Sequence, residues 1–582
     1  MAVTTEPRAG RPPGLRAATV AEAFQSTAHA YPDRVALRTK GDELSITWRE
    51  YADRVEATAA GLAGLGLGRG DTLALMLTNR PEFHWFDAAV LHLGATPFSL
   101  YNTYTAEQIQ HQVDDAGARI LVTEEAFADR ARSLTGVEHL IVVDDEGGGR
   151  VDQHAPEGFD FEATWRAVQP DDLLTLIYTS GTTGPPKGVQ LTHANLVAGI
   201  NGYDQVIAFP DEGRLVSWLP MAHIAERNCT HYLPMFVGYS TTCCPDPRQV
   251  VAYLPEVRPS WFFAVPRIWE KLKAAIEAGI EAEQDAAKKQ ATQWALDVGL
   301  RKVRAEQAGE PVDEELAAEH AKADELVLSK IRAHLGLDDV ESVNVGAAPT
   351  PREVIEFFHA IGIPVAELWG MSETTGYGAC NPPERIKIGT VGPPAPGAEV
   401  RLADDGEVLI RGPFVMPGYR NQPDKTRETI DEDGWLHTGD IGEFDDDGYL
   451  KLVDRKKELI INAGGKNMSP ANIEAKVKAS SPVIGQAIAV GDGRPYNVAL
   501  ITLDPDVAPA FEQQHGREAL ETEVERGVEA ANEQLARVEQ IKKFKLLEEE
   551  WQPGGDELTP TMKLKRKPIH DKYSAEIDAL YG

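Results

Sequence analysis

The feature that most constrains the fold is a glycine- and hydroxyl-rich segment that follows a short apolar run. The apolar run, Leu173 to Tyr178, is predicted to be a buried strand. Glycines let backbone N–H groups approach an oxyanion closely, and hydroxyl and ammonium groups add further donors. We therefore expect a cradle for a polyphosphate, formed by Thr179, Ser180, Gly181, Thr182, Thr183, Gly184 and Lys187.

This segment differs from the common P-loop. A P-loop needs Gly-Lys-Ser/Thr leading directly into a helix. Here Pro186 precedes Lys187 and Gly188 follows it, so no helix is expected to begin at the lysine. A flexible linker is the alternative reading, but linkers do not usually follow a buried strand or end in Pro-Pro-Lys-Gly. Phosphate binding is therefore favoured.

Composition limits the class of protein. The 582 residues are enough for several domains, and 42% are hydrophobic, as in a globular enzyme. The net charge of −33 disfavours nucleic acid, whose phosphates need a basic surface. The cysteines Cys229, Cys243, Cys244 and Cys380 show neither metal spacing nor a disulfide framework, which indicates a reducing compartment. Residues 1–16 lack the apolar core of a secretory signal, and no apolar run is long enough to span a membrane.

The order of predicted elements indicates an α/β fold. Strands are expected at 72–77 and 119–123, and helices at 81–93 and 105–116. Such alternation predicts parallel sheets with helices on both faces. Near the C-terminus, strands at 486–490 and 497–503 and a long helix at about 508–538 predict a small α+β unit.

A charged, alanine-rich stretch from about Glu270 to Leu335 is predicted to be helical, broken into two helices by Gly309-Glu-Pro311. Its apolar positions lie four apart, as in Ile276 and Ile280. They are too sparse for sustained heptads, which disfavours a coiled-coil arm that binds a partner. A helical hairpin packed on its own domain is expected instead.

The phosphate segment resembles the signature of the adenylate-forming superfamily, which includes acyl-CoA synthetases, firefly luciferase and the adenylation domains of peptide synthetases. Further segments resemble the other motifs of that superfamily, in the same order: 219–227, 345–349, 367–375, 434–442, 454–467 and 558–566. Segment 260–272 and the helical stretch after it resemble long-chain fatty acid–CoA ligases. The resemblance implies a large N-terminal domain, 1–454, of doubly wound sheets plus a β-barrel-like part, with a helical insertion at 270–335. A small mobile α+β domain would span 455–582.

The resemblance also implies how a nucleotide and Mg²⁺ are held. Residues expected around the adenine and the α-phosphate are Gly346, Ala347, Ala348, Glu367, Leu368, Trp369, Gly370, Met371 and Ser372. Asp440 would bind the ribose, Arg455 would contact the ribose or a phosphate, and Glu373 would hold Mg²⁺ together with Thr179. Read alone, Glu373 is better explained as a helix cap, and Asp440 as a turn residue.

Three residues are expected to be catalytic on the same resemblance. Lys187 would hold the leaving pyrophosphate, His223 would border the carboxylate substrate, and Lys563 would bridge that carboxylate and the α-phosphate. The usual pattern has glycine before the last lysine, where this chain has Met562, so Lys565 is the fallback. A Trp that gates the acyl tunnel in some long-chain ligases has no counterpart here, since Arg227 lies nearby instead.

The implied activity is that of a fatty acid–CoA ligase that forms AMP. ATP, Mg²⁺ and coenzyme A are the expected cofactor and co-substrates. The pantetheine arm of coenzyme A would pass Gly464 and Gly465, and the small domain would swing about Lys457. One alternative is adenylation of another carboxylic acid or transfer to a carrier-protein thiol, and another is a non-catalytic ATP-binding regulator. A cytoplasmic location is expected, while peripheral membrane contact and a homodimer stay open.

Overall fold

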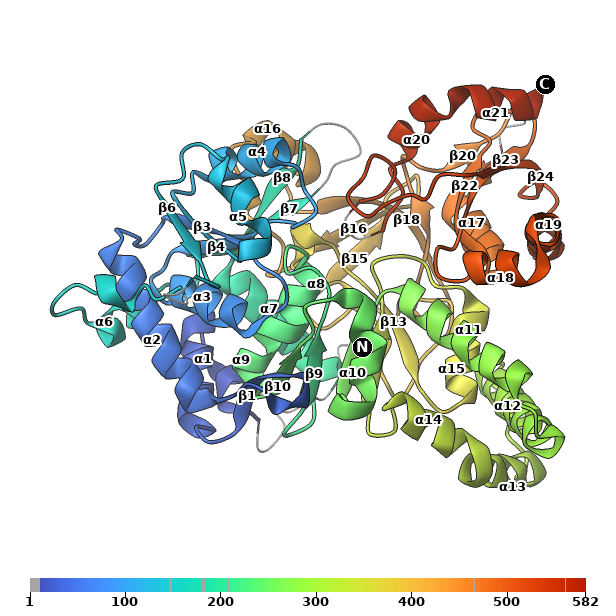
Figure 1. The fold of residues 1–582 in the computed structure, drawn as a ribbon, viewed down its shortest axis with the longest axis horizontal. Helices are drawn as coiled ribbons and strands as arrows, with labels where there is room; N and C mark the ends of the chain where they lie inside the picture. Colours follow the sequence, from blue (N-terminus) through green and yellow to red (C-terminus); the bar gives the residue numbers. More distant parts are fainter. Residues whose placement is uncertain (1–10, 146–148, 180–184, 208, 464–465, 560–561) are drawn as a thin grey trace.

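The computed structural model describes residues 11–145, 149–179, 185–207, 209–463, 466–559 and 562–582 (Figure 1). Seven of the predicted site residues lie outside the described residues: Ser180, Gly181, Thr182, Thr183, Gly184, Gly464 and Gly465. The described residues form a mixed α/β structure with a large N-terminal part and a smaller C-terminal part, in agreement with the predicted fold class.

The largest sheet of the described residues has seven strands in the order β17-β8-β7-β4-β3-β5-β6. Its strands are β3 (Thr72–Met76), β4 (Thr96–Ser99), β5 (Ile120–Thr123), β6 (His139–Val142), β7 (Leu173–Thr179), β8 (Lys187–Thr192) and β17 (Gly418–Tyr419). Strands β6, β5, β3, β4 and β7 run parallel. Its helices are α3 (Pro81–His92), α4 (Ala106–Ala116), α5 (Glu125–Arg132) and α7 (His193–Ile207). The predicted strands and helices are confirmed here to within one residue at each end.

Strand β3 shows why this sheet is covered on both faces. All five of its residues are buried. Leu73 and Leu75 belong to one buried apolar cluster, whereas Ala74 and Met76 belong to another. Since successive side chains of a strand point to opposite faces, the two clusters lie on the two sides of the sheet.

Two four-stranded sheets lie side by side in the rest of the large part, in the orders β2-β1-β10-β9 and β11-β12-β13-β14. The Ser260 backbone N–H donates to the Arg214 carbonyl over 3.0 Å and links their neighbouring edges. The strands are β1 (Val35–Thr39), β2 (Ser45–Thr47), β9 (Arg214–Ser217), β10 (Ser240–Cys243), β11 (Trp261–Ala264), β12 (Ser342–Val345), β13 (Val365–Trp369) and β14 (Ala379–Cys380). The helices are α1 (Val20–Ala30), α2 (Trp48–Gly64), α6 (Phe161–Arg166), α8 (Ile224–Glu226), η4 (Arg227–Tyr232), α9 (Leu233–Val237), α10 (Val250–Val257) and α15 (Arg352–Ala360).

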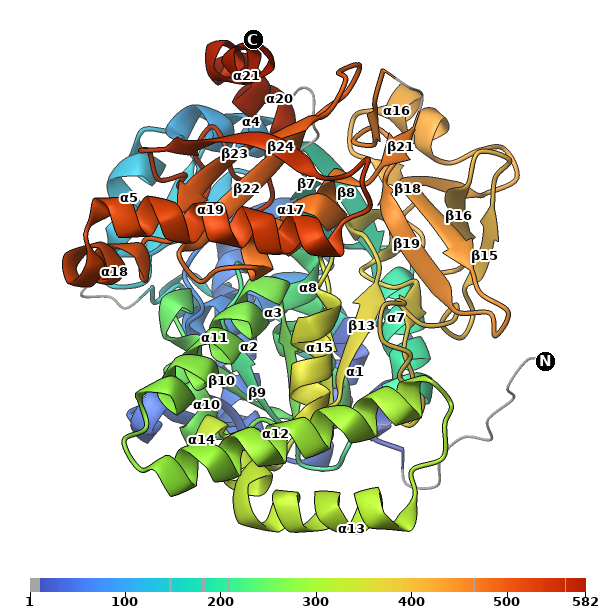
Figure 2. The same cartoon turned by 90° about the vertical axis from the view of Figure 1, so that its right-hand side faces the viewer.

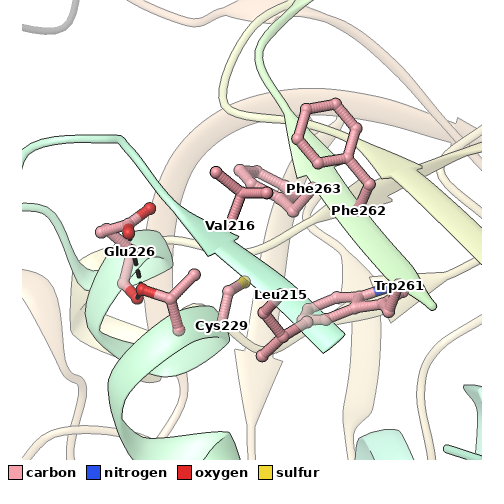
Figure 3. A pocket seen from close by; sticks show the side chains of 8 residues that line it. Leu215, Val216, Glu226, Cys229, Trp261, Phe262 and Phe263 are labelled. Carbon is pink, nitrogen blue, oxygen red and sulfur yellow. Dashed lines mark hydrogen bonds between the residues drawn. The ribbon is translucent and has the colours of Figure 1, made fainter. Parts of the chain in front are cut away.

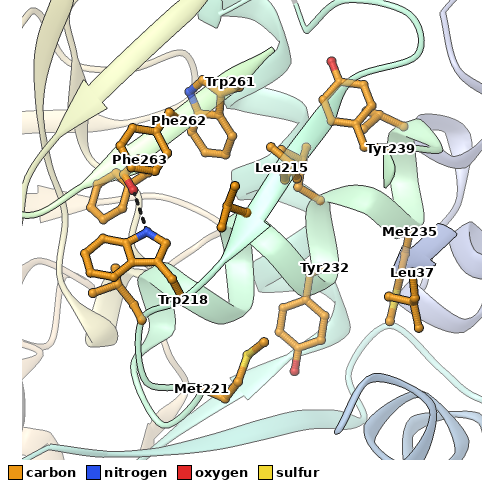
Figure 4. Close-up of a cluster of buried hydrophobic side chains, with 14 of the residues drawn as sticks. Leu37, Leu215, Trp218, Met221, Tyr232, Met235, Tyr239, Trp261, Phe262 and Phe263 are labelled. Carbon is orange, nitrogen blue, oxygen red and sulfur yellow. Dashed lines mark hydrogen bonds between the residues drawn. The ribbon is translucent and has the colours of Figure 1, made fainter. Parts of the chain in front are cut away.

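Aromatic side chains fill the core around these sheets. Figure 4 shows Trp218 beside Phe263, with its indole N–H donating to the Phe263 carbonyl over 3.4 Å. Trp261 and Tyr239 lie further along the same core and are also buried. A core of this size fixes the strand ends from which the site residues project.

The helical stretch after β11 packs on its own domain, as predicted. It comprises α11 (Pro266–Ala282), α12 (Ala286–Gln307), α13 (Glu314–Ala323), η6 (Asp324–Leu328) and α14 (Ser329–Leu335). A Cβ added at Gly299 of α12 would lie 2.2 Å from the Ala360 carbonyl oxygen of α15, so the two helices are in close contact. The expectation of a single break was wrong. A second break precedes α12, whose first turn is capped by Asp285.

An antiparallel sheet in the order β15-β16-β18-β19 follows. It contains β15 (Glu399–Leu402), β16 (Glu407–Arg411), β18 (Leu436–Phe444) and β19 (Leu450–Arg455), with α16 (Pro423–Thr429) between β16 and β18 in the chain. The resemblance assigns no residue range to the β-barrel-like part, which stays a prediction. Strand β19 ends at Arg455, where the chain passes into the C-terminal part.

The C-terminal part has its own apolar cores, built only from residues after 459. It contains β20 (Ile460–Ile461), β21 (Asn467–Met468), α17 (Pro470–Ala479), β22 (Ile484–Val490), β23 (Asn497–Leu503), α18 (Ala508–His515), α19 (Arg517–Gln534), β24 (Ile541–Leu547), α20 (Arg566–Lys572) and α21 (Ser574–Tyr581). The expectation of one long helix was wrong, because Gly516 has φ +88° and separates α18 from α19. Figure 2 shows α18 and α19 above α11 of the large part. None of the helices described here combines the length and apolarity needed to cross a bilayer.

Candidate active site

The phosphate segment connects the two strands of a β-hairpin. Thr179, the last residue of β7, lies opposite Lys187, the first residue of β8. The chain therefore continues as a strand after the lysine, which confirms that the segment is not a P-loop. Lys187 is half-buried, and its Nζ lies 4.2 Å from the centroid of the Tyr419 ring. The hairpin thus aims a lysine at an aromatic face on the neighbouring strand β17.

Glu373, the predicted metal ligand, lies on the short turn η7 (Ser372–Thr374) and is buried. Its Oε1 accepts a hydrogen bond from the Tyr419 hydroxyl over 2.8 Å. Burial lowers the pKa of Lys187, and the negative charge of Glu373 opposes that effect. Tyr419 therefore touches both site residues. Sequence reasoning missed it, because its only signal was an aromatic residue after a glycine between two motifs.

The tail lysine lies after a tight turn. The Thr559 N–H donates to the Lys563 carbonyl over 2.8 Å, and the Lys563 N–H donates to Thr559 Oγ1 over 3.0 Å. Met562 has φ +65°, a backbone conformation that glycine adopts far more readily. This explains in physical terms why the usual motif has glycine before the lysine. Met562 adopts a positive φ here at a cost in strain.

Lys563 belongs to the C-terminal part, and charges of the nucleotide-site candidates act on it. The residue is exposed, but the protein surrounding its ammonium lowers its pKa by desolvation, and the charge of Arg455 lowers it further. Asp440, Glu458 and Glu373 act in the opposite direction. Glu373 is thus within electrostatic reach of both Lys187 and Lys563.

The fallback residue Lys565 points elsewhere, since its Nζ donates to the Gly555 carbonyl over 2.7 Å. Its neighbour Arg566 forms ion pairs with Glu458 and Glu474. The charges of Asp440 and Glu373 oppose the lowering of the pKa of Lys563. The geometry favours Lys563 over Lys565.

The predicted ribose ligands contact one another. Asp440 Oδ2 accepts from the indole N–H of Trp369 over 2.8 Å, and Asp440 Oδ1 pairs with Arg455 Nε over 2.8 Å. Burial raises the pKa of Asp440, and the Arg455 charge and the Trp369 hydrogen bond counteract the rise. Each carboxylate oxygen has a second lone pair, so Asp440 can still accept from a hydroxyl. Trp369 therefore supports Asp440 in addition to offering a ring face.

The remaining adenine-site candidates lie at the ends of β12 and β13. A Cβ on Gly346 would lie 3.1 Å from Leu368, so its small size serves packing between these strands. Ala347 has φ +69°, an uncommon backbone conformation of the kind that gathers at functional sites. Burial raises the pKa of Glu367 to about 7, opposed by a hydrogen bond from the Gly389 N–H.

The other predicted residues follow on adjacent positions. Ala348 is exposed, Gly370 precedes η7, and the Met371 N–H donates to Thr374 Oγ1 over 3.1 Å. The half-buried Ser372 opens η7. The motif residues 346–348 and 367–373 thus extend from the adjacent parallel strands β12 and β13.

His223 precedes α8 and is partly buried. Its Nδ1 accepts from the Ala225 N–H over 3.2 Å. Burial lowers the pKa of His223 to about 3, and the nearby charge of Lys563 lowers it further. His223 is therefore a neutral imidazole within electrostatic reach of the tail lysine. The hydrogen bond from the Ala225 N–H also gives this residue a structural role.

Arg227, at the place of the missing gate, is fully buried. Its guanidinium pairs with Asp87 and donates to Ser99 Oγ over 2.7 Å and to the Tyr232 hydroxyl. Figure 3 shows a small cavity beside the same helical segment. Glu226 and Cys229 of that segment lie on one side of it, and the strands that carry Val216 and Phe263 lie on the other. Arg227 is tied into the protein interior and does not act as a swinging gate.

Family comparisons agree with this arrangement. The sequence description of the AMP-binding enzymes matches residues 24–420, and that of the AMP-binding enzyme C-terminal domain matches residues 457–582. The chain is 35% identical to the long-chain-fatty-acid–CoA ligase FadD15 of Mycobacterium bovis, covering 92% of each chain. It is 32% identical to the long-chain-fatty-acid–CoA ligase ACSBG2 of Gallus gallus, covering 97% of this chain and 81% of that one. The Mycobacterium tuberculosis protein fadD11 is 52% identical over 73% of this chain and 76% of its own.

Solved structures share the fold. The O-succinylbenzoate coenzyme A synthetase of Bacillus subtilis, in complex with AMP, has a TM-score of 0.69 at 23% identity and covers 94% of this chain and 97% of its own. The fatty acyl CoA synthetase of Mycobacterium tuberculosis has a TM-score of 0.62 at 23% identity and covers 96% and 99%. At such identities the likeness establishes the fold alone.

Proposed function

The chain belongs to the AMP-binding enzyme family, and from that premise we propose that it is an AMP-forming long-chain fatty acid–CoA ligase. The observation that carries the proposal is that Lys187 lies against Tyr419, whose hydroxyl donates to Glu373, and that the charge of Glu373 acts on Lys187 and also on Lys563 from the C-terminal part. A site that binds a nucleotide only for regulation has no need for a second lysine delivered from a separate part.

In the first step the fatty carboxylate attacks the α-phosphorus of ATP, an acyl–phosphate bond forms, and pyrophosphate leaves. Negative charge accumulates where the two anions meet, so cations must lie there before the reaction begins. Lys563 is proposed to bridge the carboxylate and the α-phosphate, and Lys187 to hold the pyrophosphate. Neutral His223 borders the carboxylate without adding a charge that titrates near neutral pH.

The residues present fit Mg²⁺. The described residues contain no group of three or more His, Cys, Asp or Glu side chains able to hold a metal ion. Mg²⁺ that arrives with ATP needs few protein ligands, because phosphate and water oxygens complete its shell. Glu373 is proposed to provide the carboxylate and Thr179 the hydroxyl. When bound, the ion neutralises charge on the phosphates during the first step.

In the second step the thiol of coenzyme A attacks the acyl-adenylate carbonyl and AMP leaves. The two steps need different groups over one site, so we propose that residues 455–582 turn about Lys457 relative to residues 1–454. Lys457 is exposed in the turn after β19, a place where a change of backbone angles disturbs little packing. Gly464 and Gly465 are proposed to border the pantetheine arm.

The adenine and ribose contacts are part of the same proposal. Asp440 would accept from the ribose hydroxyls with Arg455 beside it, and the ends of β12 and β13 would enclose the base. We further propose that the enzyme works in the cytoplasm, because all four cysteines are free thiols. Peripheral membrane contact and a homodimer stay predictions.

Acid-dependent exchange of labelled pyrophosphate into ATP tests the function. Fatty acids of graded length should support exchange, with long chains preferred, and the products of full turnover should be acyl-CoA and AMP. Exchange with aryl or short acids only, or transfer to a carrier-protein thiol in place of coenzyme A, would support the alternative acceptor or substrate. ATP binding with no exchange for any acid would contradict the proposal.

A further inference from the structure

Basic side chains at the start of α11, in the segment 260–272, have no role in the proposed mechanism. Arg267 is the second residue of that helix. Its Nη2 forms an ion pair with Oδ2 of Asp504, which lies in the C-terminal part just after β23. Figures 1 and 2 both place α11 next to α18, the helix that follows Asp504 in the chain. The pair therefore links the two parts of the molecule.

Asp504 is held rigidly for this contact. Its side chain is only 3% exposed. Oδ1 accepts from the Asp506 N–H over 3.0 Å and from the Val507 N–H over 3.1 Å, while the Asp504 N–H donates to the Val483 carbonyl. One carboxylate oxygen thus fixes the local turn, and the other faces Arg267. A charge buried to this extent is costly unless its partner is in place.

Arg267 has a second partner within its own helix. Its Nη1 lies 3.3 Å from Glu270 Oε2, three residues further along α11. Glu270 belongs to the large part and stays beside Arg267 whatever the orientation of the C-terminal part. The Arg267 guanidinium can therefore separate from Asp504 and still keep Glu270 as a negatively charged partner.

A nearby pair is weaker. Lys271 Nζ lies 2.5 Å from Asp506 Oδ2, but these side chains are 46% and 67% exposed. Exposed ion pairs contribute little to stability. The Arg267–Asp504 pair, whose carboxylate is buried and whose guanidinium is partly buried, is the contact that can decide the orientation.

The orientation is transmitted from Asp504 to the tail lysine through packed side chains. Asp504 directly follows β23, and Val498 and Leu500 of that strand share a buried cluster with Leu558. Leu558 is fully buried and bridges to Leu564, so it closes the turn that carries Lys563. Fixing Asp504 therefore fixes the position of Lys563 relative to the large part.

We propose that Arg267 is a positioning residue for the first step: its ion pair with Asp504 holds the C-terminal part in the orientation in which Lys563 reaches the nucleotide, and Glu270 retains the guanidinium when that part turns for the second step. This inference rests on the proposed function. It predicts that the pair supports adenylate formation selectively, because transfer to coenzyme A uses the other orientation.

The test measures the two half-reactions separately on the full chain. Acid-dependent pyrophosphate exchange reports the first, and acyl-CoA formation from supplied acyl-AMP and coenzyme A reports the second. Arg267→Ala should lower exchange by about tenfold or more, because it leaves the Asp504 charge buried without its partner. Acyl-CoA formation should stay within about twofold of the parent or rise.

Three further variants separate positioning from folding. Asp504→Asn retains an oxygen for the Asp506 and Val507 N–H groups while removing the charge, so it should lower exchange selectively as well. Adding Asp504→Asn to Arg267→Ala should recover part of the lost exchange, because no buried charge is then left alone. Arg267→Lys retains the positive charge and should lose less exchange than Arg267→Ala.

Lys273→Ala is the matched control, since Lys273 pairs with Glu277 on the same helix and contributes nothing to the Asp504 contact. It should leave both half-reactions unchanged. Equal losses of both half-reactions in Arg267→Ala, or parental exchange in that variant, would overturn the proposal. If the parent chain itself shows no acid-dependent exchange, the proposed function fails and this inference fails with it.

Discussion

The two lysines of the site are held in different ways. Lys187 lies on a strand, paired in register with Thr179, and its ammonium lies against the ring of Tyr419 in the same large part. Lys563 lies after a strained turn in a separate part, and reaches the site only through the orientation of that part. The first lysine is therefore pre-organised by local structure. The second is available conditionally, as an enzyme with two successive steps requires.

Removing the tail lysine should have the largest effect. Lys563→Ala should lower acid-dependent pyrophosphate exchange by about a hundredfold or more, since it deletes a cation placed where charge accumulates. Acyl-CoA formation from supplied acyl-AMP should remain substantial. Half-reaction assays check both values, and equal loss of the two activities would refute the conditional role of Lys563.

Glu373→Gln should raise the Mg²⁺ concentration needed for half-maximal exchange by about 10- to 100-fold, because a neutral amide is a poorer ligand for a hard cation. Tyr419→Phe is a matched variant that keeps the ring beside Lys187 and removes only the hydrogen bond to Glu373. It should cause a smaller change in the same direction. Unchanged Mg²⁺ dependence in Glu373→Gln would remove this residue from the metal site.

Lys187→Ala should affect ATP binding more than the chemical step. We expect the KM for ATP to rise about tenfold with a smaller change in kcat, because the loop hydroxyls share the pyrophosphate contact. Steady-state kinetics at varied ATP checks the split. A fall in kcat as large as that of Lys563→Ala, at saturating ATP, would erase the distinction between the two lysines.

His223 predicts a pH dependence of stability. Burial lowers its folded-state pKa to about 3. Below about pH 6.5 this histidine therefore binds a proton in the unfolded chain, whereas in the folded chain it stays neutral until the pH approaches 3. Stability supported by the neutral ring is therefore complete above that pH and is lost as pH falls toward 3. His223→Asn can still accept the hydrogen bond from the Ala225 N–H. Between about pH 3 and 6.5 it should reduce the rise of the unfolding free energy with pH by about 1.4 kcal/mol per pH unit. Denaturant unfolding at several pH values checks this, and an unchanged slope would contradict the neutral-imidazole assignment.

The smallest expected effect concerns the strained turn. Met562→Gly should stabilise the C-terminal part by at most about 1 kcal/mol, because relief of the positive φ is partly offset by the greater freedom of glycine when unfolded. Met562→Ala keeps the strain and serves as the control. The denaturant midpoint of Met562→Gly should be higher than that of Met562→Ala. A lower midpoint for Met562→Gly would show that the turn is not strained.

Much of the fold followed from local pattern. Thr105 and Gln108 cap α4 reciprocally, and the apolar run at Leu173 forms β7 as expected. The helix expected at 508–538 was wrong because Gly516 adopts a positive φ, which periodicity does not reveal. The break before α12 was missed because a capping aspartate, Asp285, resembles the surrounding charged surface.

The site was predicted less completely, for a different reason. Motif order indicated Lys187, Glu373 and Lys563, whereas the contacts that hold them depend on packing between distant segments. Tyr419 reaches Glu373 across 46 residues of chain, and Asp504 reaches Arg267 across 237. No local spacing encodes such pairs. Arg227 likewise looked like a neighbour of the site, and only burial beside Asp87 showed its structural role.

The most direct test of the central claim follows oxygen from the fatty acid to the nucleotide. Turnover with fatty acid labelled with ¹⁸O in its carboxylate should place one labelled oxygen in the phosphate of AMP, because the carboxylate attacks the α-phosphorus and leaves an oxygen there when coenzyme A displaces AMP. Unlabelled AMP, or label in inorganic phosphate together with ADP, would contradict the account.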